Sequence, residues 1–565
     1  METNGKPLIV LSDMTLLFDE RTAGSEEARV SLAGFAELVK NAGPLHTYRM
    51  TPLTLWNAAS AGITSLYVVE TLERYGKYGI PSGLPGELKR LMDRYGRLRL
   101  DRSADGGEDE LALSGDEEIM RELESEPSLQ AMLASRQSGA PFRIGAERRG
   151  ALKQELLRLG YPVVDAAGYR AGELLPLVLR GQTTGGASFA LRDYQRQAVE
   201  RFVRGDAAAG GSGVMVLPCG SGKTIVGIGV LAALQCATLI LTSSLTSVQQ
   251  WQAELLDKTT LGSRSIGQYS SQEKQVRAVT IATYNMLATS GGEERDYRHM
   301  RLFGERDWGL IIYDEVHMLP APVFRMTAEL QATRRLGLTA TLVREDGRER
   351  DVFSLIGPKL YEMPWKQLER HGHIAELRCE EVRVPLPEAT ERDYWVGDSR
   401  TRVRLAAENP NKTAVIRELL DRHRDKPALI IGAYLRQLKA IAAALDAPLL
   451  TGEVPHEERA KLYEAFRRGE ERVLVVSKIA NFAVDLPDAA VAVQVSGSFG
   501  SRQEEAQRIG RLLRPKREHN SAVFYTVVSD GTMEVDYALK RQRFMTEQGY
   551  RYGLTTVKSR GGERA

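Results

Sequence analysis

Short apolar runs of strand length recur through the second half of the chain, separated by segments in which apolar residues have helical spacing. A first group of runs lies at 214–217, 238–241, 279–282, 310–313 and 336–339. A second group lies at 428–431, 473–476, 490–495 and 522–528. Strands that alternate with helices in this way are typical of a parallel sheet covered on both faces. The pattern predicts two α/β lobes in tandem, over residues 189–360 and 412–565, joined by a connector over 361–411.

The N-terminal third has a different organisation. A strand-like run at 8–11, followed by helical spacing, predicts a compact α/β domain over residues 1–100. Residues 101–125 contain ten acidic and two basic residues with glycines among them, so we expect an acidic, solvated linker or loop. A second small domain and its own linker are predicted over residues 126–188.

Composition narrows the class of protein. Apolar residues make up 42% and charged residues 27% of the chain, which excludes wholesale disorder and a coiled-coil or collagen-like rod. The three cysteines, at 219, 236 and 379, have no metal-ligand spacing and fit a reducing compartment, so we expect a cytoplasmic protein. The apolar stretch 225–241 is shorter than the roughly 20 residues that a membrane span needs. It predicts a buried helix followed by a buried strand, with no membrane as partner.

The net charge is small but unevenly distributed. The 76 Lys and Arg residues almost balance the 74 Asp and Glu residues, which leaves a formal charge of +2. Residues 101–125 carry −8, whereas residues 501–565 carry 13 basic against 8 acidic side chains. The near-neutral total therefore combines an acidic segment with a mildly basic C-terminal region.

A glycine-rich loop follows the apolar run at 214–217 and precedes an apolar helix. Its residues are Gly220, Ser221, Gly222, Lys223 and Thr224. In such a loop, backbone N–H groups surround phosphate oxygens, Lys223 reaches the β- and γ-phosphates and Thr224 binds Mg²⁺. Leu217 stands where the strict motif has its first glycine, so a strand-to-helix turn with an incidental lysine is the alternative. The flanking strand and helix favour phosphate binding.

Two adjacent carboxylates, Asp314 and Glu315, follow the apolar run at 310–313. They suit two different tasks, with Asp314 holding Mg²⁺ and Glu315 polarising the attacking water. An acidic pair after a strand is by itself usually a solvated turn. The glycine loop earlier in the chain favours the catalytic interpretation.

Arg511 and Arg514 lie three positions apart in the second lobe, so on a helix they share one face. A guanidinium pair there could meet γ-phosphate charge from across a cleft. The alternative is a basic helix face in solvent or on nucleic acid. The need for a stimulating arginine outside the phosphate loop favours the first interpretation.

Three further patterns are weaker. Thr339 and Thr341 follow an apolar run, where their hydroxyls could relay the state of a nucleotide. The charged triad 344–346 is by itself more typical of an exposed turn. His317 has no spacing to other histidines that implies a metal, and it could be a structural residue.

These motifs, in this order, resemble those of superfamily 2 helicases. The shared elements are LRDYQ (191–195), the glycine loop, TSS (242–244), TY (283–284), DEVH (314–317), TAT (339–341) and QRIGRLLR (507–514). Longer segments resemble the XPB family of DNA repair helicases: HTYRMTPLTLW (46–56), LGLTATLVRED (336–346), LIGPKLY (355–361), VSK (476–478), DLP (485–487) and GSRQEEAQRIGRLLR (500–514). The likeness extends over nearly the whole chain.

The resemblance implies an ATP-dependent DNA helicase of 3′→5′ polarity acting in DNA repair, with two RecA-like lobes and an XPB-type N-terminal domain. It assigns 126–188 to a damage-recognition-like domain and places a thumb-like insertion in the connector. It implies roles for individual residues as well. Nucleotide contacts would come from Gln195 and Asp485, arginine fingers from Arg511 and Arg514, coupling of the lobes from His317 and Gln507, and strand separation from Arg344, Glu345 and Asp346.

The resemblance also sets expectations for partners. Forked, damaged or junction DNA is the expected partner, and a nuclease is a candidate. Residues 479–482 depart from the Val-Gly-Asp-Thr of the eukaryotic motif, which favours a free-standing prokaryotic helicase associated with the nucleoid. We hypothesise that the acidic segment 101–125 competes with DNA for the basic surface.

Two alternatives remain open at this point. One is a double-stranded DNA translocase that uses the same motor without separating strands. The other is a non-enzymatic damage-binding scaffold with a vestigial nucleotide site. The intact lysine, acidic pair and arginine pair count against the scaffold.

Overall fold

The computed structural model describes most of the chain. The described residues are 5–42, 44–103, 110–130, 132–133, 137, 139–203, 211–218, 220–288, 298–320, 323, 327, 330–331, 333–340, 349–477, 489–497, 509–510, 512–513 and 520–557. Contacts divide the chain into two units. The first comprises Met1–Val39, Pro44–Leu217 and Gly222–Met363, and the second comprises Lys40–Gly43, Pro218–Ser221 and Pro364–Ala565.

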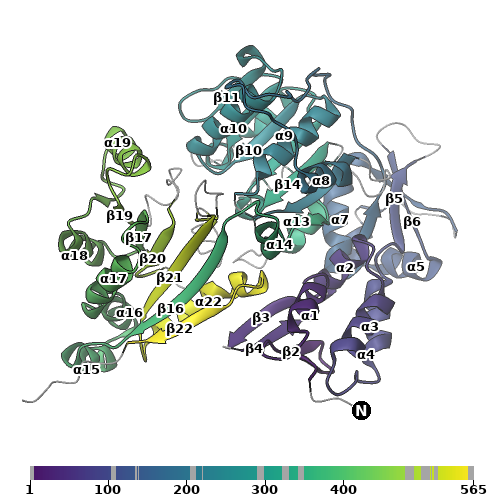
Figure 1. Ribbon diagram of the computed structural model, residues 1–565. Helices are drawn as coiled ribbons and strands as arrows, with labels where there is room; N and C mark the ends of the chain where they lie inside the picture. The colour runs from purple at the N-terminus through teal and green to yellow at the C-terminus, as the bar shows by residue number, and fades with distance from the viewer. Residues whose placement is uncertain are drawn as a thin grey trace, which may run out of the picture. The chain divides into compact units, whose positions relative to one another are not determined.

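The N-terminal domain of the first unit is built on a four-stranded sheet of order β1-β2-β4-β3 (Figure 1). Its strands are β1 (Leu8–Val10), β2 (Thr15–Asp19), β3 (Glu37–Ala42) and β4 (Leu45–Arg49), and its helices are α1 (Ser25–Leu32), α2 (Pro52–Ser60), α3 (Ser65–Tyr75) and α4 (Leu84–Met92). Helix α2 begins at a capping box, in which the Thr51 side chain accepts from the backbone N–H of Thr54. Strand and helix residues such as Phe18 and Leu72 form one buried core.

A second four-stranded sheet, of order β7-β6-β5-β8, forms what we call the small domain, residues 98–165. Its strands are β5 (Leu98–Arg102), β6 (Glu110–Gly115), β7 (Phe142–Gly145) and β8 (Val163–Asp165), and its helices are α5 (Glu117–Ser125), α6 (Pro127–Gln130) and α7 (Arg149–Arg158). Strands β5 and β6 are antiparallel, with Leu98 opposite Gly115.

This domain corrects the expectation of an acidic linker over 101–125. Residues 104–109 lie outside the described residues, but the rest of the segment holds the end of β5, strand β6 and helix α5. Leu111 and Leu113, two positions apart on β6, are buried on the same face of the sheet, and Ile119 and Leu123 lie one helical turn apart in the same core. The apolar positions therefore set the structure, and the acidic side chains occupy the faces between them.

Lobe 1, the rest of the first unit, contains a seven-stranded sheet of order β11-β12-β10-β13-β14-β9-β15 in which every pairing is parallel. Its strands are β9 (Ser212–Val216), β10 (Thr238–Thr242), β11 (Ile266–Tyr269), β12 (Val279–Thr283), β13 (Leu310–Asp314), β14 (Arg334–Thr339) and β15 (Lys359–Glu362). Its helices are α8 (Asp193–Val203), α9 (Lys223–Leu234), α10 (Leu245–Lys258), α11 (Tyr284–Ala288) and α13 (Glu349–Leu355).

Lobe 2, in the second unit, contains another seven-stranded parallel sheet, of order β18-β19-β17-β20-β21-β16-β22. Its strands are β16 (Glu376–Val384), β17 (Ala428–Gly432), β18 (Leu449–Leu450), β19 (Val473–Ser477), β20 (Val491–Gln494), β21 (Ser521–Ser529) and β22 (Tyr552–Thr556). The helices of this unit are α14 (Trp365–Arg370), α15 (Glu388–Val396), α16 (Ser399–Ala407), α17 (Asn411–Asp421), α18 (Leu435–Leu445), α19 (His456–Arg467) and α22 (Met533–Glu547).

The two parallel sheets confirm the predicted fold class, and all nine apolar runs are strands: β9, β10, β12, β13, β14, β17, β19, β20 and β21. The stretch 225–241 is a buried helix followed by a buried strand, as predicted. Among the described residues, no helix is both long and apolar enough to cross a membrane.

The predicted connector 361–411 differs from the structure. It contains β16, which pairs with β21 along its whole length, so the sheet of lobe 2 begins well before residue 412. Helices α15 and α16 lie where the thumb-like insertion was predicted. In α15 the side chain of Tyr394 is 4% exposed, whereas that of Trp395 is 58% exposed.

Candidate nucleotide-hydrolysis site

The sheet of lobe 1 brings the predicted motifs to one edge. Strand β14 pairs with β13 on one side and with β9 on the other, and Thr339 lies opposite Val216. The backbone N–H of Leu217 donates to the carbonyl oxygen of Thr339 over 2.9 Å. Because parallel strands end at the same edge of a sheet, the residues that follow these strands meet there. The glycine loop, the acidic pair and Thr339 are therefore neighbours.

The glycine loop leads from β9 into α9. Gly220 and Gly222 have φ angles of 79° and 81°, a left-handed backbone that glycine adopts without strain. Gly222 is the residue before the first turn of α9, which begins with Lys223 and Thr224. A loop of this form, ending at a helix N-terminus, directs backbone N–H groups at an anion.

Gln195 lies against this loop. Its side chain is 4% exposed, and its Oε1 accepts from the backbone N–H of Arg192 over 3.0 Å. A Cβ atom at Gly222 would lie only 2.7 Å from Gln195 Nε2. The side-chain amide of Gln195 thus packs against Gly222, so the LRDYQ segment (191–195) ends at the glycine loop.

Glu315 lies at a sharp turn after β13. Its φ of 52° and ψ of 54° are uncommon for a residue other than glycine, and the 3₁₀ turn Val316–Met318 follows directly. Its Oε1 lies 3.3 Å from Lys223 Nζ, and its Oε2 lies 3.5 Å from His317 Nδ1. Burial would raise the pKa of Glu315, but the charge of Lys223, then that of His317, outweighs burial and lowers it. Glu315 is therefore an ionised carboxylate at neutral pH.

Asp314 ends β13 beside this residue. Its Oδ2 accepts from Trp251 Nε1 over 2.9 Å, and its backbone oxygen accepts from Tyr284 Oη over 2.9 Å. Burial, and then the neighbouring charge of Glu315, raises the pKa of Asp314 to about 6. Two half-buried carboxylates thus lie near one lysine, an arrangement in which a divalent cation would relieve the repulsion.

No local pattern in the sequence points to Trp251 as a residue of the site. It lies on α10 and is 1% exposed, so its role arises from tertiary packing rather than from a local motif. A tryptophan in an amphipathic helix needs an acceptor for its N–H group when it is buried, and that is the signal that could have identified it.

His317 and Thr339 also meet. His317 Nδ1 lies 2.8 Å from Thr339 Oγ1, and the imidazole is buried. The DEVH segment and the end of β14 are therefore joined by a direct side-chain hydrogen bond.

Several predicted site residues lie outside the described residues. They are Thr341, Arg344, Glu345, Asp346, Asp485, Gln507, Arg511 and Arg514.

A parallel α/β sheet with a glycine loop and an acidic pair at its carboxyl edge defines a nucleoside-triphosphate-hydrolysing enzyme of the P-loop class. Comparison with known proteins narrows this class. A family model described as ERCC3/RAD25/XPB C-terminal helicase matches residues 368–564. A model described as type III restriction enzyme, res subunit, matches residues 188–344, and one described as helicase conserved C-terminal domain matches residues 8–138.

Relatives match almost the entire chain. A DNA 3′-5′ helicase XPB of Kineococcus radiotolerans is 50% identical over 550 residues, which cover 97% of this chain and 96% of the relative. The DNA 3′-5′ helicase XPB of Mycobacterium tuberculosis is 48% identical, with 97% of each chain covered. A general transcription and DNA repair factor IIH helicase/translocase subunit XPB of Enterocytozoon bieneusi is 32% identical, with 97% and 92% covered. The chain belongs to the XPB family of helicases.

Proposed function

We propose that this protein is an ATP-dependent DNA helicase of 3′→5′ polarity that acts in DNA repair. The observation that carries the proposal is the placement of Lys223, Glu315 and Asp314 together at the carboxyl edge of a parallel sheet. The names of the two relatives at about half identity over the full chain support the polarity and the DNA substrate.

The residues of the loop fit ATP. Residues 220–224 would hold the phosphates, with Lys223 released from Glu315 to reach the γ-phosphate. Gln195, which already lies against Gly222, would contact the adenine. Each of these contacts would be made from a side chain or a helix N-terminus that lies at the loop.

The acidic pair fits hydrolysis. Asp314 and Thr224 would hold Mg²⁺, which when bound supplies positive charge to the phosphates. Glu315 is ionised and would polarise the attacking water and accept its proton. His317 and Thr339 would transmit the state of the nucleotide from this edge, since they already bond to each other beside Glu315.

Residues outside the described parts complete the proposal through the resemblance to the family. Arg511 and Arg514 would act as arginine fingers, Asp485 would complete the nucleotide contacts, and Gln507 with His317 would couple the lobes. The triad 344–346, with Thr341, would act on DNA strands. A nuclease partner and a location at the nucleoid remain predictions from the sequence.

The test is strand displacement on forked DNA, run together with phosphate release in the presence and absence of DNA. We expect ATP-dependent unwinding from a 3′ tail and DNA-stimulated phosphate release, both lost in Lys223→Ala. Release that persists in this variant would contradict the site, because Lys223 is the cation that the loop presents to the phosphates.

A second candidate is a translocase that moves along duplex DNA without unwinding it. The more distant relative is named a helicase/translocase subunit, which favours keeping this candidate. DNA-stimulated phosphate release without strand displacement on any fork would support it. A scaffold without enzymatic activity would show neither.

A further inference from the structure

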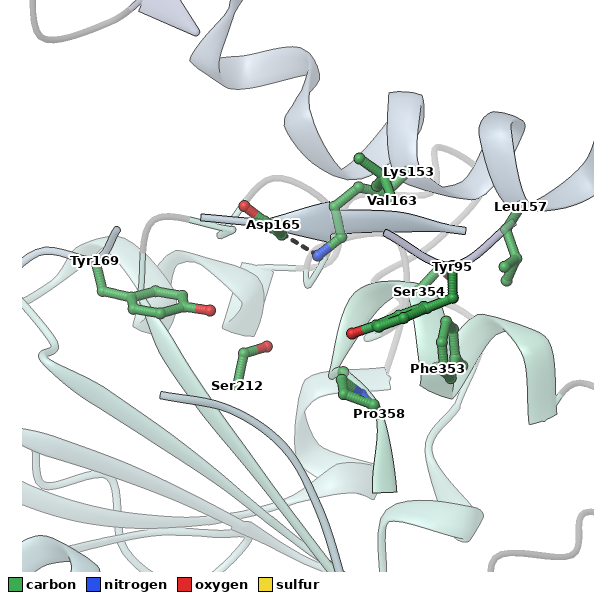
Figure 2. A pocket seen from close by; sticks show the side chains of 11 residues that line it. Tyr95, Lys153, Leu157, Val163, Asp165, Tyr169, Ser212, Phe353, Ser354 and Pro358 are labelled. Atoms are coloured by element: carbon green, nitrogen blue, oxygen red, sulfur yellow. Dashed lines mark hydrogen bonds and ion pairs between the residues drawn. The ribbon is translucent and has the colours of Figure 1, made fainter. Parts of the chain in front are cut away.

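A second cluster of charged residues lies in the first unit, where the small domain meets lobe 1. Arg149 and Lys153 lie one turn apart on α7, and Asp165 ends β8. Arg149 Nη2 is 2.7 Å and Lys153 Nζ is 2.9 Å from the Asp165 carboxylate. Figure 2 shows the lysine joined to Asp165, with Tyr169 and Ser212 lining the same pocket. One carboxylate therefore binds two cations of the small domain.

The same lysine also reaches lobe 1. Lys153 Nζ donates to Gln331 Oε1 over 3.0 Å, and Gln331 Nε2 donates in turn to the carbonyl oxygen of Leu355 over 3.1 Å. Next to this contact, Leu157 of α7 packs with Phe353 of α13 in a small apolar cluster. Helix α7 is thus attached to lobe 1 by a polar chain and an apolar contact.

The segment between the two domains passes through the cluster. Arg149 Nη1 donates to the carbonyl oxygen of Gly168 over 3.0 Å, and Arg334 Nη1 donates to that of Arg170 over 2.8 Å. The Tyr169 ring between them lies 5.4 Å from the Arg149 guanidinium and 5.7 Å from that of Arg335. Cations from the small domain and from lobe 1 therefore hold the same aromatic ring.

We call the contact between the small domain and lobe 1 the joint; it is formed by Arg149, Lys153, Asp165, Tyr169, Gln331 and Arg335. Burial of its cations restricts the joint to one geometry. Lys153 is 7% exposed, Arg149 3% and Arg335 0%, so three cations are withdrawn from water around Asp165. Buried ion networks add little net stability but are costly to break by removing one member. Burial, together with the neighbouring charges of Arg335 and Arg149, lowers the pKa of Lys153 to about 8 although Asp165 opposes this shift. An arrangement of this kind selects one geometry rather than strengthening the fold.

Strands β9 and β14 connect the joint to the carboxyl edge of the lobe 1 sheet, where the glycine loop and the acidic pair lie. We call this edge the nucleotide edge. Arg335 and Ser212 lie opposite each other near the start of these strands, and Arg335 Nη2 donates to Ser212 Oγ over 2.9 Å. Thr339 and Leu217 lie at the other end of the same strands. At about 3.3 Å per residue, Arg335 and Thr339 are therefore about 13 Å apart along β14.

We propose that Lys153 and Asp165 are positioning residues that hold the small domain against lobe 1 beside β9 and β14, so that the placement of this domain sets how strongly DNA stimulates hydrolysis at the carboxyl edge of the sheet. This proposal rests on the proposed DNA-driven ATPase. Neither residue touches the nucleotide site, so both act through the geometry of the joint.

The test compares Lys153→Met with Arg158→Ala in the full-length protein. Arg158 lies on the same helix in an exposed ion pair with Glu155, so its loss removes a cation of α7 that does not face lobe 1. We expect Lys153→Met to retain kcat and KM for ATP in the absence of DNA. The factor by which forked DNA stimulates its ATPase rate should fall about fivefold or more below that of the wild type. Arg158→Ala should retain both. Equal stimulation in the two variants, or an equal loss of basal and stimulated rates in Lys153→Met, would overturn the proposal.

Two further measurements separate positioning from loss of folding. Gln331→Leu, on the lobe 1 side, should reproduce the loss of stimulation, and the double variant with Lys153→Met should lose no more than either one. Additive losses would contradict a shared contact. Hydrogen exchange of peptides over 166–175, without ATP or DNA, should be faster in Lys153→Met than in Arg158→Ala. An unstimulated wild type with this exchange difference would refute the proposed function and leave the joint standing, whereas equal exchange would refute the joint itself.

Discussion

Replacing Glu315 by glutamine is expected to slow hydrolysis and to tighten ATP binding at the same time. The change removes one charge and keeps the size of the side chain. Glu315 Oε1 lies 3.3 Å from Lys223 Nζ, and the two side chains are only 20% and 11% exposed. A γ-phosphate must therefore take Lys223 away from Glu315 before it can bind the ammonium group.

The size of the effect follows from this competition. Two unit charges at the observed separation attract each other by about 5 kcal/mol at an effective dielectric constant of about 20. Hydrogen bonds to charged groups contribute a net amount of about 1.5–3 kcal/mol, because both groups lose water on pairing. Releasing this amount should tighten ATP binding by about 10- to 100-fold at most. Loss of the general base should slow hydrolysis by about 10²- to 10⁴-fold.

The assay is calorimetric titration with MgATP, followed by single-turnover hydrolysis on the same preparation. Glu273→Gln, an exposed residue of lobe 1 in a loop beyond β11, is the matched control and should change neither quantity. A Glu315→Gln protein that binds ATP more weakly than the wild type would refute the competition. One that hydrolyses ATP at the wild-type rate would refute the role of Glu315 as base.

Three other changes test separate parts of the structure. Trp251→Phe removes the indole donor to Asp314, so the free energy of unfolding in denaturant should fall by about 1.5–3 kcal/mol; an unchanged value would show that the bond contributes nothing. Gly222→Ala places a Cβ atom 2.7 Å from the Gln195 amide at a residue with a left-handed φ. The left-handed backbone alone costs alanine about 1 kcal/mol, so ATP affinity in the same titration should fall by at least about fivefold. Burial lowers the pKa of Lys153 in the folded state to about 8, below the unfolded value of about 10.4. Between these two pH values Lys153 is protonated in the unfolded chain but not in the folded one. The free energy of unfolding therefore rises with pH in this range. Unfolding at pH 8 and pH 10 should show this rise in the wild type and a smaller one in Lys153→Met; equal slopes would contradict the assignment.

The site at the carboxyl edge could be predicted because it depends on two local patterns. A fully buried parallel strand reads as an uninterrupted apolar run, and residues such as 238–241 have no other stable placement in a soluble α/β domain. The polar residues that directly follow such runs must then meet at one edge. Lys223, Asp314 and Thr339 were therefore predictable neighbours without any knowledge of the helices between them.

Elements with mixed patterns could not be predicted in this way. Strand β16 carries Glu380 and Glu381, both buried, and Glu381 accepts from Gln542, a residue far along the chain. Strand β6 and helix α5 were not predicted for the same reason, because their acidic side chains suggested a solvated linker. A charged side chain indicates an exposed segment only where the segment has no apolar face to bury and the charge has no partner in the fold. Partners of this kind are supplied by the tertiary fold, and no local window of sequence contains them.

The amino and carboxyl ends of the strands of lobe 1 differ in how completely their charged side chains are hydrogen-bonded. This difference indicates at which end a conformational change begins. At the joint, the Arg335 guanidinium donates to backbone carbonyl oxygens of Leu355, Gln331 and Thr333 as well as to Ser212. Nothing there is gained by rearrangement, so the joint keeps one geometry. At the nucleotide edge one lysine faces two carboxylates, and a phosphate with its cation would exchange every one of these pairings. Binding energy is therefore released at the carboxyl ends of β9, β13 and β14, while the amino ends of β9 and β14 stay fixed to the small domain. Motion driven by ATP should accordingly begin at Glu315 and in the turn Val316–Met318, directly after β13.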